Sequence, residues 1–363
     1  MSTRTDTVLL ILSALLPALA QAQSGELELR LERCAVLGDA SARLACYDAL
    51  ARNAGQALPF ASPASAAAAA GAPARTQPAG PPPEPRLPAA IAAITTIPPE
   101  AKVTPMVQGW ELDRSSKRGR FNFRPHRDNY LLPLNYSTSA NDGPFKDFTP
   151  EGLKSQHAEL AYQLSFKMKM LEQIAQTPLD LWFAYTQQSY WQAYNRAASS
   201  PFRETNYQPE LMLVTPLNLE LDRYTVRYLN LGLVHQSNGQ ASTLSRSWNR
   251  VYLEMGAERD ELGLTLRLWQ RLDTARPDND NIDIIDYMGH GELRIVYRLG
   301  GQELSLLARH NFSTNHGAVQ LGWAFPLSAN LKGYMQLFSG YGQSLIDYNY
   351  AQKSLGAGFL VNY

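Results

Sequence analysis

Apolar and polar residues alternate along most of the chain after residue 105. From Leu160 to Met170, apolar side chains occupy the even positions and mostly polar ones the odd positions; 262–269 and 293–299 repeat this alternation. Because successive side chains of a strand point to opposite faces, the pattern predicts β-strands with one apolar face. We expect strands at 121–138, 158–170, 178–195, 207–218, 224–236, 246–257, 261–272, 283–299, 302–312, 315–326, 331–341 and 344–363.

Such strands fit two folds. A soluble all-β sandwich would turn the apolar faces inward, whereas a transmembrane barrel would turn them towards lipid. Three features favour the barrel: the segments reach about ten residues or more, their number is even, and an aromatic residue, Tyr363, ends the last apolar stripe. The connections Arg259-Asp260, Gly300-Gly301 and Ser328–Asn330 are short, as periplasmic turns should be. We therefore predict an all-β domain over residues 105–363, a 12-stranded antiparallel transmembrane β-barrel.

The beginning of the chain predicts export. Within residues 1–22, Arg4 supplies a positive charge, Val8–Leu16 is apolar, and Ala20-Gln21-Ala22 has the small residues of a cleavage site. The apolar run is too short to span a membrane, so a cleaved signal peptide is the better interpretation.

Two further segments separate this signal from the barrel. Residues 23–56 have a helical character and contain Cys34 and Cys46, the two cysteines of the chain. In an exported segment a disulfide is the default for such a pair, so we expect a short helical, disulfide-linked periplasmic segment. Residues 57–104 are dominated by Ala and Pro, which predicts a disordered linker that buries little surface.

Composition adds bounds but no activity. The 363 residues include 33 Lys and Arg and 33 Asp and Glu, so the formal net charge is zero. This balance gives no reason to expect a nucleic-acid partner. The 18 Tyr and 6 Trp suit a protein with many side chains at a membrane–water interface.

Candidate chemistry lies between Tyr228 and Glu254. His235 and Ser237 share one face of a predicted strand with three leucines, and Asn249 shares an apolar face of the next strand. A base, a hydroxyl and a group that holds the base are what an acyl-transfer site needs. Each could also be an ordinary strand-end or turn residue. Their place on apolar faces favours a function, because polar groups there cost free energy unless paired or used.

The same residues resemble a known family. The runs HQSNG at 235–239 and SRSWNR at 245–250 are similar to the signature of outer membrane phospholipase A, including the spacings from His235 to Ser237 and Asn249. The runs 199–207 and 340–349 also look like this family, and the resemblance covers about residues 105–363.

The resemblance implies an enzyme that hydrolyses acyl ester bonds of phospholipids and lysophospholipids, at either acyl position, in the outer leaflet of the bacterial outer membrane. Ser237 would be the nucleophile and His235 the general base and acid. Asn249 would orient His235, and the backbone N–H of Gly239 would stabilise the oxyanion.

The resemblance also implies calcium. The ligands would be oxygens of Gln240 and Ser245, together with Ser199 from a second subunit. The family usually has arginine where Gln240 stands, a change that matters little if the ligand is a main-chain carbonyl. The acidic run Asp278–Asp286 is a more obvious cation candidate, although we read it as a solvated loop.

A subunit contact has a separate argument. An apolar stripe from Leu179 to Tyr185 continues into Gln187, and an amide facing lipid is costly unless another chain pairs with it. Gln187 also matches a position at the family's dimer interface. We therefore expect a reversible homodimer that completes the calcium site.

The strand pattern places this chemistry on the outer wall. If the first strand rises from the periplasm, the strand bearing His235 rises too, and its leucine face meets lipid near the outer leaflet. Two alternatives stay open: a non-enzymatic porin-like or structural barrel, and a barrel esterase for another substrate.

Overall fold

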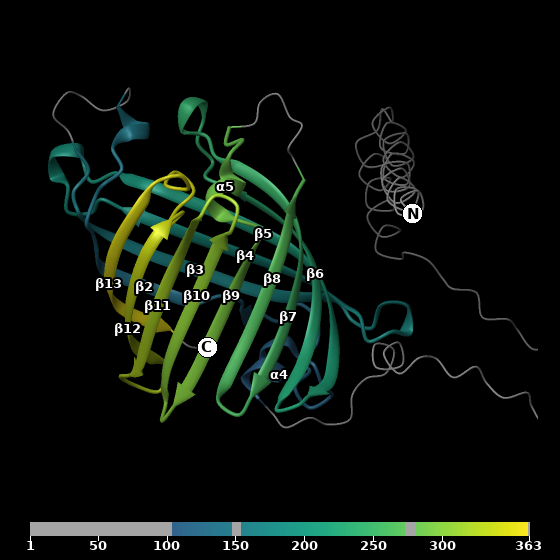
Figure 1. The fold of residues 1–363 in the computed structure, drawn as a ribbon. Coiled ribbons are helices and arrows are strands. Elements are labelled where there is room, and N and C mark those ends of the chain that lie inside the picture. Colours follow the sequence, from purple (N-terminus) through teal and green to yellow (C-terminus); the bar gives the residue numbers. More distant parts are fainter. Residues whose placement is uncertain (1–103, 147–153, 273–279, 362–363) are drawn as a thin grey trace, which may run out of the picture. The chain divides into compact units, whose positions relative to one another are not determined.

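The computed structural model describes residues 104–146, 154–272 and 280–361. The expected signal peptide, the Cys34–Cys46 segment and the linker lie outside the described residues except for Thr104, and so do Asp278 and Tyr363. Twelve strands, β2 to β13, form one antiparallel sheet in which each strand pairs with its sequence neighbours and β13 pairs with β2 (Figure 1). The predicted 12-stranded antiparallel barrel is therefore confirmed.

The barrel strands are β2 (Asn129–Ser137), β3 (Ala158–Leu171), β4 (Asp180–Trp191), β5 (Phe202–Leu221), β6 (Tyr224–Ser237), β7 (Ser247–Arg259), β8 (Leu262–Arg271), β9 (Gly291–Leu299), β10 (Gln302–Asn311), β11 (His316–Pro326), β12 (Leu331–Tyr341) and β13 (Ala351–Val361). The remaining elements are helices α4 (Pro105–Trp110) and α5 (Ile284–Met288), the short strand β1 (Arg124–Pro125), and the 3₁₀ turns η1 (Gly143–Phe145), η2 (Ile174–Gln176), η3 (Arg196–Ala198) and η4 (Ser242–Leu244). No helix within the described ranges is long and apolar enough to cross a membrane.

The outer wall of the barrel is apolar. Leu231 and Leu233 on β6 are about half exposed, at 50% and 53%, while the intervening Gly232 and the following Val234 are buried. Leu231 pairs with Leu253 across to β7, so leucines lie side by side on the outside. The soluble sandwich is therefore wrong for this chain, because its apolar faces would point inward.

The inside of the barrel is packed with charged and aromatic side chains. Arg267 on β8 lies 2.6 Å from Glu254 and 3.3 Å from Glu210, and these three side chains are nearly inaccessible. Lys169 contacts Asp180 at 2.9 Å. Buried charges are tolerated when they are paired in this way. The lumen thus contains a polar core that joins adjacent strands and also strands such as β5 and β8 that are not neighbours.

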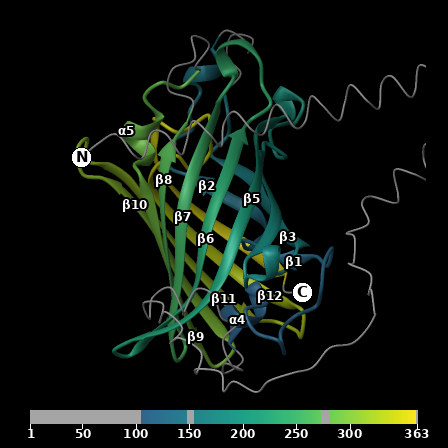
Figure 2. The ribbon, with the colours of Figure 1, turned by 90° about the vertical axis from the view of Figure 1, so that its right-hand side faces the viewer.

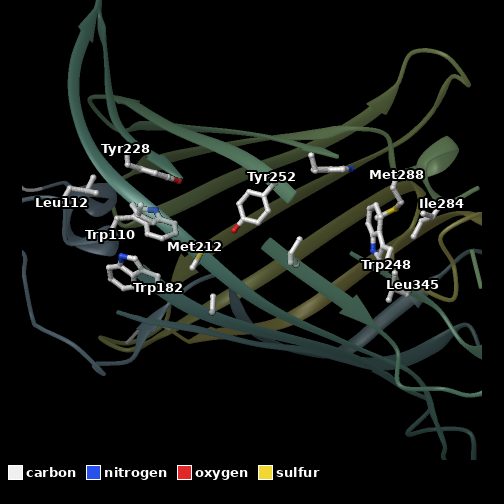
Figure 3. Close-up of a cluster of buried hydrophobic side chains, with 14 of the residues drawn as sticks. Trp110, Leu112, Trp182, Met212, Tyr228, Trp248, Tyr252, Ile284, Met288 and Leu345 are labelled. Atoms are coloured by element: carbon white, nitrogen blue, oxygen red, sulfur yellow. The ribbon is translucent and has the colours of Figure 1, made fainter. Parts of the chain in front are cut away.

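One apolar cluster extends through this core (Figure 3). Trp110 from α4 lies with Trp182 and Tyr228 in one part of it, and Trp248 lies with Ile284 from α5 in the other. Each short helix therefore fills one end of the lumen and contributes side chains from outside the sheet.

Three predicted strands differ from the observed ones. The expected strand 121–138 is interrupted: β1 pairs with β3 over two residues, and β2 begins at Asn129. The expected strand 283–299 begins as helix α5, and residues 342–350 form a loop before β13 that is buried over 342–348. The apolar residues in these stretches, among them Ile284 and Leu345, pack over the end of the lumen instead of alternating along the wall.

The connections differ in length between the two ends of the barrel. At one end, turns of two residues join β5 to β6, β7 to β8 and β9 to β10. Gly300 and Gly301 form the last of these with φ of 57° and 82°, values that favour glycine. The other end carries the longer loops, including those that follow β4, β6 and β12. Figure 2 shows β5, β6 and β7 adjacent in the wall, and the candidate residues lie where β6 and β7 meet a long loop.

Candidate active site

The register of β6 and β7 sets the geometry of the site. His235 and Asn249 are direct partners across the two strands, and His235 Nδ1 lies 2.8 Å from Asn249 Oδ1. An amide oxygen accepts hydrogen bonds, so the proton of the neutral imidazole lies on Nδ1 and Nε2 is left as the base. His235 is exposed on the outer wall. The pair predicted from sequence alternation is therefore in contact.

Ser237 ends β6 on the same face as His235. Two residues along a strand rise about 6.6 Å, so the hydroxyl lies one step beyond the imidazole, towards the loop end of the barrel. Within the described residues Ser237 Oγ and His235 share no hydrogen bond. Such bonds often tighten only when substrate binds.

Gly239 follows in the β6–β7 loop with a φ of 65°. A Cβ at this position would lie 3.2 Å from Tyr207 Cε2, so both the backbone and the space favour glycine. Within the described residues its N–H has no acceptor, which suits a group that binds substrate.

The predicted calcium ligands belong to two loops. Gln240 and Ser245 lie in the β6–β7 loop on either side of η4, whereas Ser199 follows η3 in the β4–β5 loop and is exposed. Ser245 Oγ donates a hydrogen bond to the Asp280 carboxylate. In the described part of the chain no three His, Cys, Asp or Glu side chains converge as a metal site.

The sequence offered the acidic run Asp278–Asp286 as a cation candidate. It gave no reason to single out Asp280 within that run. The run supplied the charge, but only the fold shows that this carboxylate reaches Ser245.

A groove opens beside the His–Asn pair on the outer wall. It has a volume of about 480 Å³, and apolar side chains of β4, β5 and β6 form much of its lining. These are Phe183, Pro209, Leu211, Leu233 and Val234, next to His235 and Asn249. An acyl chain is the kind of group such a surface can accept.

Gln187 lies half-buried on β4 in the stripe predicted to face lipid. Its Oε1 accepts a hydrogen bond from Tyr185 Oη at 3.3 Å, and its Nε2 donates to Tyr162 Oη at 3.4 Å. These two hydrogen bonds within the chain offset part of the free-energy cost of placing an amide on the outer wall. This differs from the sequence argument, in which a second chain supplied the partner.

Comparisons with known proteins show the family of the chain. The family model described as phospholipase A1 matches residues 106–361. The chain is 42% identical to a putative phospholipase A1 of Neisseria meningitidis serogroup B over 268 residues, which are 71% of this chain and 70% of that protein.

Two solved structures are also similar, and each comparison covers 68% of this chain and 94% of the other. One is a Salmonella typhi outer membrane phospholipase dimer with bound calcium, with a TM-score of 0.64 and 34% identity. The other is an active-site mutant of Escherichia coli outer membrane phospholipase A in which alanine replaces an asparagine, with a TM-score of 0.63 and 34% identity.

Proposed function

The chain belongs to the phospholipase A1 family of the bacterial outer membrane, and from that premise we propose that Ser237, His235 and Asn249 form its catalytic triad. The reaction is hydrolysis of acyl ester bonds in phospholipids and lysophospholipids of the outer leaflet. The observation that carries the proposal is the 2.8 Å contact between His235 and Asn249 on a lipid-facing wall. The active-site asparagine of the E. coli relative supports the role of Asn249.

The alternatives fit the barrel less well. A porin-like barrel needs an aqueous lumen, whereas buried ion-paired side chains such as Arg267, Glu254 and Glu210 project into this one. An esterase for a soluble substrate has no need of a site on the lipid-facing wall. The apolar groove next to His235 favours a lipid substrate instead.

The reaction divides into two acyl-transfer steps. His235 Nε2 takes the hydroxyl proton of Ser237 as Oγ attacks the ester carbonyl carbon, and the Gly239 N–H donates to the developing oxyanion. The tetrahedral intermediate expels the lysolipid alkoxide, which receives the proton from His235. Water, deprotonated by the same imidazole, then attacks the acyl carbonyl carbon, and the imidazolium returns that proton to Ser237 Oγ as the bond to the acyl group breaks and the fatty acid leaves.

Asn249 fixes the tautomer of His235 without adding charge. A neutral amide stabilises the imidazolium less than the aspartate of a serine protease does. Because esters are cleaved more readily than amides, the weaker support is sufficient.

Calcium fits the oxygen donors around the β6–β7 loop. The Ser245 hydroxyl, a Gln240 oxygen and the nearby Asp280 carboxylate are all hard ligands of the kind this ion prefers. We propose that Gln240 and Ser245, together with Ser199 of the partner subunit, hold the ion in a reversible homodimer with Gln187 at its interface. Bound there, calcium would supply positive charge that stabilises the developing oxyanion. The calcium-bound dimer of the Salmonella relative supports this part of the proposal.

The test is phospholipid hydrolysis by refolded protein in detergent, with calcium and then with chelator. Ser237→Ala and His235→Ala should each lose activity by about a thousandfold or more. Ser247→Ala, which removes a hydroxyl directly across the strand pair from Ser237, is the matched control and should stay active.

Each other outcome removes a defined part of the proposal. Hydrolysis that survives Ser237→Ala would exclude this nucleophile. Activity that persists in chelator, or that calcium raises without a doubling of the protein mass measured by sedimentation, would exclude calcium or the dimer as a requirement.

A further inference from the structure

Asn238 lies between the proposed nucleophile and the proposed oxyanion donor, yet its side chain points away from both. It is only 3% exposed. In the sequence it reads as an ordinary turn residue before a glycine. Its burial and its hydrogen bonds indicate a more specific role.

The amide of Asn238 closes the β6–β7 loop on itself. Oδ1 accepts hydrogen bonds from the backbone N–H groups of Gln240 at 3.3 Å and Arg246 at 2.9 Å. Nδ2 donates to the carbonyl oxygen of Leu244 at 2.8 Å. The backbone N–H of Asn238 also donates to Arg246 O at 3.0 Å. One side chain thus ties both ends of the loop that carries Gly239.

The fourth hydrogen bond of this amide leads out of the loop. Asn238 Nδ2 donates to Glu204 Oε2 on β5 at 3.3 Å, so both acceptor sites and both donors of the amide are used. Glu204 is 1% exposed, and its other oxygen, Oε1, accepts from Asn206 Nδ2 at 2.6 Å and from Ile346 N at 3.1 Å. One carboxylate therefore joins the catalytic loop to the loop before β13.

This arrangement explains two runs that the triad leaves unused. The stretches 199–207 and 340–349 meet at Glu204 and Ile346, and Leu345 N donates to Asn206 Oδ1 at 2.9 Å. Their contact forms a buried, hydrogen-bonded layer that supports the β6–β7 loop. Through Glu204, this contact ties the loop that carries Gly239 to β5 and to the loop before β13.

We propose that Asn238 is a positioning residue for phospholipid hydrolysis: it fixes the Gly239 N–H relative to Ser237, and Glu204 locks it in place. This inference rests on the proposed triad. An oxyanion donor acts only if it is aimed at the place where charge develops, and a displacement of about 1 Å can cost about 100-fold in rate. Asn238 touches no reacting atom and acts through the loop backbone.

A donor–acceptor swap tests the contact itself. Asn238→Asp keeps the oxygen that accepts from Gln240 and Arg246 but turns a second acceptor towards Glu204. Glu204→Gln keeps the oxygen that serves Asn206 and Ile346 but turns a donor towards the donor of Asn238. In the double variant, the amide introduced by E204Q can donate to the carboxylate introduced by N238D, so the mismatch is removed.

We expect each single variant to lower kcat by about 10- to 100-fold with KM changed less than about threefold. The double variant should recover at least about tenfold relative to Asn238→Asp, although the bond to Leu244 stays lost. Gel mobility before and after heating reports folding of each barrel. Asn129→Ala is the matched control, because Asn129 also accepts from and donates to one backbone segment, at Ser165 on β3.

Two results would overturn the inference: a double variant no more active than Asn238→Asp, or single variants with wild-type kcat. If Asn238 had a purely structural role, its variants and Asn129→Ala would lose heat stability to a similar extent. The loss of kcat in the single variants and its recovery in the double variant would then not be seen. Failure of the triad is seen separately, because Ser237→Ala would then retain hydrolysis whatever the Asn238 variants do.

Discussion

Asn249 orients one imidazole ring in the proposed triad, and the effect of its removal can be separated from that of the proposed nucleophile, Ser237. The amide oxygen lies 2.8 Å from His235 Nδ1, so it holds the ring by a single hydrogen bond. In the proposed mechanism Ser237 and His235 exchange a proton, and no other group can take either role. Asn249 would contribute geometry alone, which water or another acceptor can supply in part.

Asn249→Ala should therefore lower kcat by about 100-fold, less than the loss expected for Ser237→Ala. Asn249→Asp should stay within about tenfold of wild type, because a carboxylate oxygen still accepts from Nδ1. Both are measured as kcat on mixed phospholipid–detergent micelles. Equal losses in the two variants would show that the amide nitrogen, not the oxygen, is what the site needs.

For single residues, the sequence predicts the contacts of side chains on strands but not the contacts of side chains in loops. The alternation of β6 and β7 suffices to place His235 beside Asn249, because period two fixes the face of each side chain. Asn238 is one residue past β6, where no period applies, and only the fold shows that its side chain turns inward. The link between Ser245 and Asp280 was missed for the same reason.

At the scale of the secondary-structure elements, buried ion pairs hold the long loops in place where strand pairing does not reach. Arg203 at the start of β5 donates to Glu159 on β3 through two bonds of 2.9 Å, and to Asp347 in the loop before β13 at 2.9 Å. The Arg203 side chain is 8% exposed and that of Asp347 is fully buried. Three segments distant in sequence are thus joined by one guanidinium group.

Arg203→Ala should lower the free energy of unfolding by about 3 kcal/mol or more, because it leaves two carboxylates buried without their cation. Arg196→Ala, in the exposed η3 turn nearby, should change it by less than about 0.5 kcal/mol. Urea unfolding of the refolded barrel measures both. Similar values for the two would mean that the network contributes little to stability.

The sequence predicts the wall elements well and the ends of the lumen poorly. Where one face of a strand meets lipid and the other the lumen, apolar and polar residues alternate clearly. The bounds of most strands were therefore predicted to within a few residues. Helix α5 and the loop at 342–350 contain apolar residues such as Ile284 and Leu345 without that alternation, because these segments cover the end of the barrel. Apolar runs of this length fit a strand equally well, and only contacts distant in sequence decide between them.

In the barrel as a whole, apolar side chains face outward and charged side chains are buried inside, which is the reverse of a soluble protein. Leucines face outward at mid-wall, as Leu253 does on β7, while Glu254 beside it is buried in the lumen. The stability of the barrel should therefore depend on the depth at which a charge is placed on the outer wall.

Leu253→Arg, near the middle of β7, should cost about 2–4 kcal/mol in lipid bilayers. Leu299→Arg, at the end of β9 next to the Gly300–Gly301 turn, should cost only about 0–1 kcal/mol. Unfolding titrations in vesicles compare the two variants with wild type. A cost that does not depend on position would contradict the assignment of this face to lipid.

The seam between β2 and β13 has a consequence for how the chain reaches its folded state. Across it Ser137 bonds to Gln352, 215 positions away, so the first and last strands of the barrel meet only after the whole chain is available. Until then β2 and β13 each present a free edge that can pair with another chain. Contacts of such long range close slowly. Export of the last strand must therefore be complete before the barrel can close, and the time spent with open edges is when the chain is most exposed to pairing with other chains.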